Sequence, residues 1–211
     1  MMGLEALELT KNINILAALV RSKISNINWD ESYKKDLINF EKYGDIGDIW
    51  FGEESMLRII KWITSSSISH SSRIIDIGCG NGIFLSYLAD EGFNNLFGVD
   101  YSEDAIILAK SIAYKRETPI HFEVANIASN DFKNGTNLKK PFDVVHDKGT
   151  FDAISLCPND AKLMMQTYIQ NIVEILADEG FYILTSCNWT EKELISKFSY
   201  CKYLIFIVEK I

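Results

Sequence analysis

The strongest constraint on the fold is an alternation of short apolar runs with helical patterns between residues 72 and 198. The apolar runs are Arg73–Ile77, Leu96–Val99, Ile120–Val124, Phe142–Val145 and Phe181–Leu184. Amphipathic helical patterns separate most of them, for example Ser102–Tyr114 and Asp160–Leu176. Strand, helix and strand repeated at this period predict an α/β fold, with a parallel sheet and helices on both of its faces.

Residues 1–70 differ from this pattern because their apolar residues follow helical spacing. One such pattern covers Leu4–Ile24, and two apolar stripes follow it: Tyr33, Leu37 and Phe40, then Met56, Ile59, Ile60 and Ile63. The loop Tyr43–Gly52 between the stripes carries three glycines and three large aromatic residues. We expect residues 1–70 to form an N-terminal helical extension and residues 71–211 a single domain. Trp50 and Phe51 are candidates for a lid, although Trp50 could instead pack between the N-terminal helices.

Composition and charge exclude several classes of protein. The chain has 21 basic and 29 acidic residues, a net charge of −8, which argues against a non-specific nucleic-acid binder. Cys79, Cys157, Cys187 and Cys201 are widely spaced, which predicts free thiols and a cytoplasmic protein, and the scattered histidines imply no metal site. The apolar run Ile13–Val20 is too short to span a membrane.

The first apolar run of the domain ends in a carboxylate and a glycine-rich turn. Asp76 lies in this run, and Gly78, Gly80 and Gly82 follow it before the next helical pattern. A dinucleotide-binding turn would need a third glycine at position 83, where the chain has isoleucine. A carboxylate here suits a ligand with an ammonium group or hydroxyls better than a pyrophosphate. The alternative is a simple tight turn with no ligand.

The next two strands end in residues that extend this candidate site. Asp100 ends the second run, where its carboxylate can accept two hydrogen bonds from a ribose diol, and we place Tyr101 beside it in the same site. Asp100 could instead cap a helix, but Ser102 is the better placed cap. The third run ends near Asn126 and Ile127, where an amide could contact an adenine edge. Together these residues predict a site for S-adenosylmethionine.

Three longer segments make the chain resemble a known family. The segments Tyr43–Ser55, Asp147–Ile154 and Thr185–Thr190 are similar to signature blocks of the elongation factor 1-alpha lysine methyltransferases, in particular the EEF1A lysine methyltransferase 2 family. The resemblance runs from about Trp29 to Phe198. It implies a Rossmann-like, seven-strand methyltransferase that transfers a methyl group from S-adenosylmethionine to a lysine of elongation factor 1-alpha. We also expect a monomer without direct contact to nucleic acid or membrane.

The chain departs from the family at two places. Asn126 stands where the family usually has aspartate. Residues 199–211 are unlike the family and supply one strand at most, at Tyr203–Val208. We therefore expect the C-terminal strand hairpin to be incomplete, which would leave an exposed apolar edge.

Three residues are candidates for catalysis. The acceptor lysine must be neutral, because its ordinary pKa of about 10.4 leaves it as an ammonium, which is not a nucleophile. Asp147 is a candidate to orient the amine or the cofactor, or alternatively to cap the following turn. Asn188 and Trp189 are candidates to line the lysine side of the pocket, or alternatively to pack under the loop. A small-molecule methyltransferase and an inactive cofactor-binding isoform are the alternative functions.

Overall fold

The computed structural model describes residues 28–132, 138, 141–199 and 203–208. The helix predicted over Leu4–Ile24 lies outside these residues. None of the helices in the described ranges is both long and apolar enough to cross a membrane.

The described strands form one six-stranded sheet, in which every pair of neighbours is parallel. Its strands are β1 (Ile74–Ile77), β2 (Leu96–Asp100), β3 (His121–Val124), β4 (Phe142–Lys148), β5 (Leu176–Ser186) and β6 (Tyr203–Val208). They lie in the order β3-β2-β1-β4-β5-β6, which reverses direction between β1 and β4. A reversal of this kind opens a crevice at the carboxyl ends of the two strands, where ligands of open α/β sheets bind.

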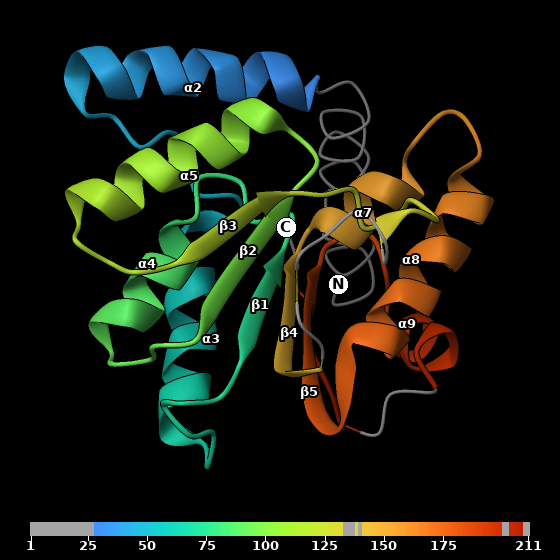
Figure 1. Ribbon diagram of the computed structural model, residues 1–211. Helices are drawn as coiled ribbons and strands as arrows, with labels where there is room; N and C mark the ends of the chain where they lie inside the picture. The colour runs from blue at the N-terminus through green and yellow to red at the C-terminus, as the bar shows by residue number, and fades with distance from the viewer. Residues whose placement is uncertain (1–27, 133–137, 139–140, 200–202, 209–211) are drawn as a thin grey trace, which may run out of the picture.

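Helices cover both faces of the sheet, which confirms the predicted α/β architecture (Figure 1). One side carries α2 (Trp29–Tyr43), α3 (Gly52–Ser65), α4 (Ile83–Asp90) and α5 (Glu103–Lys115). The other side carries α7 (Thr150–Ser155), α8 (Ala161–Ile175) and α9 (Glu191–Lys197). The sequence patterns predicted α5 and α8 within one residue of their observed ends, and a helix at the position of α4. They did not predict the short helix α7.

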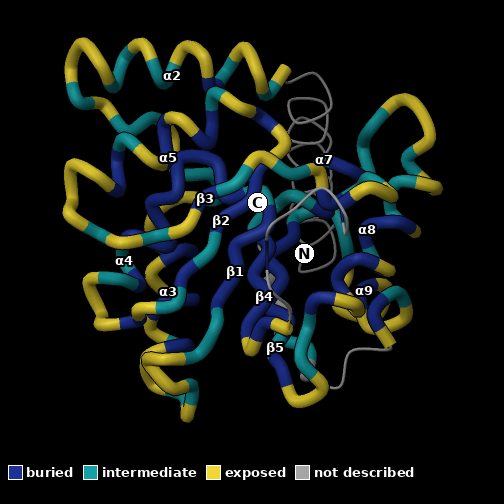
Figure 2. Tube along the Cα trace, viewed as in Figure 1, coloured by how far each residue is buried: buried dark blue, intermediate teal, exposed yellow. Residues whose placement is uncertain are grey.

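Two hydrophobic clusters hold these layers together, one on each face of the sheet. Successive strand residues belong to different clusters: Ile74 packs with α3, α4 and α5, whereas Ile75 packs with α7, α8 and α9. Figure 2 shows the sheet buried between helices whose outer turns are exposed. The central strands are covered on both sides, so they appear in the sequence as continuous apolar runs.

The two N-terminal apolar stripes form the buried faces of α2 and α3, as their spacing predicts. Tyr33 is buried in α2, and Ile59 and Ile63 in α3 have no exposed surface. These residues share a cluster with Ile74 of β1. Helices α2 and α3 therefore pack on the sheet domain, and the boundary at residue 70 stays a prediction.

The C-terminal half differs from prediction at the start of β5. Strand β5 begins at Leu176, directly after α8, rather than at Phe181, because Leu176 pairs with Phe142 before a register shift in the ladder. Because this irregular stretch contains the exposed Asp178 and Glu179, the start of β5 does not appear as an apolar run in the sequence. Tyr203–Val208 forms the one expected strand, and it pairs with β5 in parallel. A seventh strand is not among the described residues.

The packing of α3 on the sheet can be tested at Ile63. Truncation in the variant Ile63→Ala leaves a cavity in the shared cluster, so the free energy of unfolding should fall by about 2–5 kcal/mol. The control Ile38→Ala changes a side chain that is 42% exposed and should cost less than about 0.5 kcal/mol. Urea denaturation followed by circular dichroism measures both. An unchanged main transition in Ile63→Ala would mean that α3 is not part of the sheet's core.

Candidate functional site

The glycine-rich turn after β1 is fixed by a carboxylate from the next strand. The Gly80 N–H donates to Oδ2 of Asp100 over 3.0 Å. Gly80 has φ +53°, and a Cβ at this position would lie 2.5 Å from the Tyr33 hydroxyl oxygen. A side chain at this position would clash with the Tyr33 side chain of α2 and would strain the backbone.

Asp100 is held at the other oxygen as well. Its Oδ1 accepts the Ser102 N–H over 3.0 Å, at the start of α5. Ser102 occupies the N-cap position, but its side chain makes no capping hydrogen bond. The Asp100 carboxyl is 5% exposed, and burial raises its pKa to about 6 although both N–H donors act to lower it. Each oxygen retains a lone pair for a ligand.

Asp76 is held by a histidine that the sequence patterns did not single out. Nδ1 of His146 lies 2.7 Å from Oδ1 of Asp76, and both side chains are buried. The His146 ring stacks on Phe84 with a centroid distance of 4.0 Å. Asp76 and His146 are register partners in β1 and β4, so their side chains share one face of the sheet. The pairing follows from strand register, which leaves no local pattern in the sequence.

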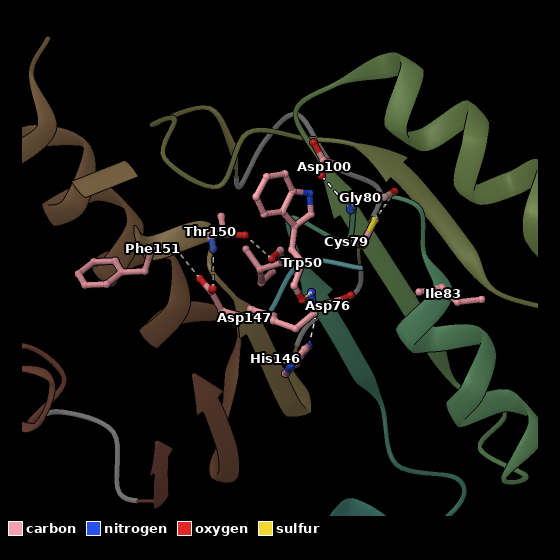
Figure 3. Close-up of polar contacts among 12 residues, drawn as sticks. Trp50, Asp76, Cys79, Gly80, Ile83, Asp100, His146, Asp147, Thr150 and Phe151 are labelled. Atoms are coloured by element: carbon pink, nitrogen blue, oxygen red, sulfur yellow. Dashed lines mark hydrogen bonds and ion pairs between the residues drawn. The ribbon is translucent and has the colours of Figure 1, made fainter. Parts of the chain in front are cut away.

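A cavity of about 380 Å³ opens at the carboxyl ends of β1 and β4, the place that the sheet order predicts. Figure 3 shows Asp76, Gly80 and Asp100 on one side of this region and Thr150 on the other, with Trp50 between them. The predicted cofactor-site residues that line the cavity are Trp50, Asp76, Gly78, Gly80, Asp100, Tyr101, Asn126 and Ile127.

Gly82 is the predicted cofactor residue that does not line the cavity. A Cβ on Gly82 would lie 2.7 Å from the Phe122 ring and 2.9 Å from Cβ of Ala109. Gly82 therefore permits close packing of α4 against the neighbouring elements, which is a structural role.

The loop Tyr43–Gly52, called the aromatic loop below, is held over the cavity by two hydrogen bonds and by close packing of Phe51. Nδ2 of Asn81 donates to the Ile46 carbonyl over 2.9 Å, and Nζ of Lys148 donates to the Trp50 carbonyl over 2.9 Å. Gly149, at φ +90°, leaves room for the Phe51 ring, which a Cβ there would approach to 2.6 Å. The Trp50 ring lines the cavity and packs edge-on against Trp29. The packing alternative therefore describes its contact with α2, and the role of Trp50 as a lid stays a prediction.

The predicted catalytic residue Asp147 does not line the cavity. Its fully buried carboxylate accepts the N–H groups of Thr150 (2.8 Å) and Phe151 (3.0 Å) and the Tyr168 hydroxyl. These contacts match the alternative interpretation, in which Asp147 caps the turn that follows it, because the carboxylate holds the start of α7. The structure gives no support to the orienting role predicted for Asp147.

Asn188 and Trp189 are also absent from the residues that line the cavity. The Trp189 ring packs 5.7 Å from Phe151 and lies under the Lys197 ammonium. The Asn188 N–H donates to the Ser186 hydroxyl. The packing alternative therefore describes their contacts, and their catalytic roles remain predictions without a geometric counterpart.

Two cysteine thiols are among the other ionisable groups that line the cavity. Cys79 is buried, and burial raises the pKa of its thiol well above the ordinary value. Cys157 lines the cavity as a free thiol. The described ranges contain no group of three or more His, Cys, Asp or Glu side chains that could hold a metal ion.

Comparison with known proteins identifies the class. The family model described as "Methyltransferase domain" matches residues 68–204, which include the whole described sheet except the end of β6. A solved structure of the N-methyltransferase NodS from Bradyrhizobium japonicum WM9, in complex with S-adenosyl-L-homocysteine, shares the fold. Its TM-score is 0.54 at 23% identity, covering 75% of this chain and 72% of that one. The fold is that of a methyltransferase.

Two relatives identify the family within this class. EEF1A lysine methyltransferase 2 of Danio rerio is 45% identical over 170 residues, which cover 81% of this chain and 71% of that protein. Protein-lysine N-methyltransferase efm4 of Schizosaccharomyces pombe is 36% identical over 203 residues, which cover 87% of this chain and 84% of that protein. The chain belongs to the EEF1A lysine methyltransferase 2 family.

The buried carboxyls of this region should make stability depend on pH. Burial raises the pKa of Asp147 to about 7 and that of Asp100 to about 6. The folded chain then binds more protons than the unfolded chain between about pH 4 and pH 7, so the free energy of unfolding should fall as the pH rises through that window. Urea denaturation at about pH 5 and about pH 8 measures this change.

The variant Asp147→Asn isolates one of the two groups. Since it removes one titrating carboxyl, its free energy of unfolding should change less between the two pH values than that of the unaltered chain. In Tyr168→Phe, which loses a donor that lowers the pKa of Asp147, the fall should extend to higher pH. The same pH dependence in all three proteins would contradict the assignment.

Proposed function

We propose that this protein transfers a methyl group from S-adenosylmethionine to a lysine of elongation factor 1-alpha. The proposal rests on the pair of buried carboxylates Asp76 and Asp100, which lie near the carboxyl ends of the adjacent strands β1 and β2 and line one cavity. The cofactor has two groups that such carboxylates bind, an ammonium and a ribose diol. The cavity volume falls within the range of roughly 300–1,000 Å³ that is typical of small-molecule sites.

The lining of the cavity fits the three parts of this cofactor. The free lone pairs of Asp100 accept from the ribose hydroxyls, and Asp76, oriented by His146, accepts from the ammonium. The Asn126 side-chain oxygen already accepts the Ala128 N–H over 2.9 Å, which leaves its Nδ2 as a donor to the adenine. Ile127 and Tyr101 supply apolar contact beside it.

The chain's own contribution to catalysis is position and exclusion of water. S-adenosylmethionine, when bound, supplies a methyl group on a sulfonium that is a good leaving group. Trp50 and Phe51 cover the cavity and exclude water, and the apolar side chains Ile154 and Met164 line its remaining wall. A lysine side chain held in such a channel loses hydration, which lowers its pKa and favours the neutral amine. Alignment of the amine with the methyl group supplies several kcal/mol of the barrier.

The protein substrate is proposed from the relatives. Proteins named EEF1A lysine methyltransferase 2 in Danio rerio, Mus musculus and Homo sapiens are 43–45% identical to this chain over about four-fifths of its length. The net charge of −8 suits a basic protein partner better than a nucleic acid. A cytoplasmic location fits the free cysteines among the described residues, and the monomeric state stays a prediction. The seven-strand sheet implied by the resemblance stays a prediction.

The ribose contact can be tested with the variant Asp100→Asn. The amide loses the charge and half of the acceptor capacity of the carboxylate, so affinity for S-adenosylhomocysteine should fall by about tenfold or more. The exposed Asp178→Asn carries the same charge change and should bind as the unaltered chain does. Calorimetric titration measures all three proteins. Equal affinity of Asp100→Asn and Asp178→Asn would place the ribose elsewhere.

The activity can be tested on the substrate itself. The purified chain, incubated with S-adenosylmethionine and elongation factor 1-alpha, should methylate a lysine that mass spectrometry locates, and Asp100→Asn should be much slower at limiting cofactor. Small amines should not replace the protein as acceptors. Cofactor binding without transfer to the elongation factor would favour an inactive isoform, and transfer to small amines would favour a small-molecule methyltransferase.

A further inference from the structure

Lys148 is a charged side chain of the cavity that neither the sequence patterns nor the proposed reaction explains. It ends β4, next to the capping residue Asp147, and it lines the cavity. Among the described residues of the lining, it is the only lysine or arginine. The acidic residues of the same lining are Asp48, Asp76 and Asp100. A single cation in an otherwise acidic and apolar cavity is a candidate to bind an anionic group of a ligand.

The protein supplies Lys148 with one hydrogen-bond acceptor. Its Nζ donates to the Trp50 carbonyl over 2.9 Å, and the described part of the chain offers no second acceptor to it. A lysine ammonium has three N–H donors, so two remain for a ligand. Burial lowers the pKa of Lys148, whereas the charges of Asp76 and Asp147 act to keep it protonated. A partly buried ammonium gains from an anion that enters the cavity.

Asp76 lies close enough to Lys148 to stabilise its charge, but the two form no direct ion pair within the described residues. The Asp76 carboxylate is instead held by His146. One acidic and one basic side chain thus stand near each other on the adjacent strands β1 and β4, with neither neutralising the other in a salt bridge. An α-amino acid carries an ammonium and a carboxylate on one carbon. The two side chains match these two groups.

We propose that Lys148 binds the carboxylate of the cofactor's amino-acid end, while Asp76 binds the ammonium. This inference rests on the proposed function, in which the cavity holds S-adenosylmethionine. Because the same ammonium holds the Trp50 carbonyl, it joins the amino-acid end of the cofactor to the aromatic loop. Lys148 is then a binding residue that selects for the complete amino-acid group.

The test compares two ligands on matched proteins by calorimetry. One ligand is S-adenosylhomocysteine, and the other is its decarboxylated analogue, which keeps the ammonium and lacks only the carboxylate. The proteins are the unaltered chain, Lys148→Met, Lys148→Arg and the control Lys61→Met. Lys61 is an exposed lysine of α3 outside the cavity, so Lys61→Met makes the same charge change at a neutral position.

Lys148→Met should lose about tenfold to a hundredfold in affinity for S-adenosylhomocysteine, the size expected for a charge-assisted hydrogen bond. Its affinity for the decarboxylated analogue should stay within about twofold of that of the unaltered chain, or rise, because the repulsion between two ammonium groups is gone. Lys148→Arg should retain part of the preference for the carboxylate, and Lys61→Met should behave as the unaltered chain.

Equal losses for both ligands in Lys148→Met would overturn the proposal and leave Lys148 as a support of the aromatic loop alone. If Lys148→Met does not fold, the affinities of the unaltered chain for the two ligands test the proposal. Equal affinities would show that the ligand carboxylate has no partner in the protein and would overturn the proposal. Failure of the unaltered chain to bind either ligand would instead contradict the proposed cofactor site. The two failures are therefore distinguishable.

Discussion

The site depends on two hydrogen bonds that the Asp100 carboxylate accepts, one from the glycine-rich turn and one from the start of α5. They join the ends of β1 and β2 and fix the glycine turn, in which Gly80 has a positive φ that favours glycine. Tyr33 of α2 packs directly on this turn, and the aromatic loop that follows α2 then closes the cavity. Tyr33 therefore links α2 to the glycine turn that Asp100 holds.

The buried carboxylates of this protein differ in how many hydrogen bonds they accept from the chain. This difference separates carboxylates that hold the structure together from those that are open to a ligand. Asp147 accepts three hydrogen bonds and lies outside the cavity, and Asp152 is occupied by Ser186 and Cys187. Asp100 and Asp76 accept fewer and line the cavity. Since burying a carboxylate is costly, acceptor capacity left open at such a site indicates a ligand.

The segment Asp147–Ile154 illustrates how far sequence reasoning reached. Its resemblance to a family block indicated the right family, and its position after β4 placed it near the site. The roles of single residues in this segment could not be predicted from the sequence, because they depend on the direction of each side chain. They also depend on α7, a helix too short to show a helical spacing of apolar residues. Asp147 holds α7, whereas its neighbour Lys148 faces the cavity.

Strand ends were predictable for a physical reason, and tertiary pairings were not. Apolar runs locate buried parallel strands, and the carboxyl ends of such strands meet at one edge, so Asp76, Asp100 and Asn126 could be placed together. The pairing of His146 with Asp76 depends on strand register, and the irregular start of β5 depends on a ladder shift. Neither leaves a local pattern in the sequence.

The most direct test of the account is a crystal structure of the chain with S-adenosylhomocysteine. The ribose hydroxyls should lie within hydrogen-bond distance, about 3 Å, of the Asp100 carboxylate, with the ammonium at Asp76 and the carboxylate at Nζ of Lys148. A ligand bound at another edge of the sheet, or bound here with its ribose away from Asp100, would contradict the central claim that this carboxylate organises the site.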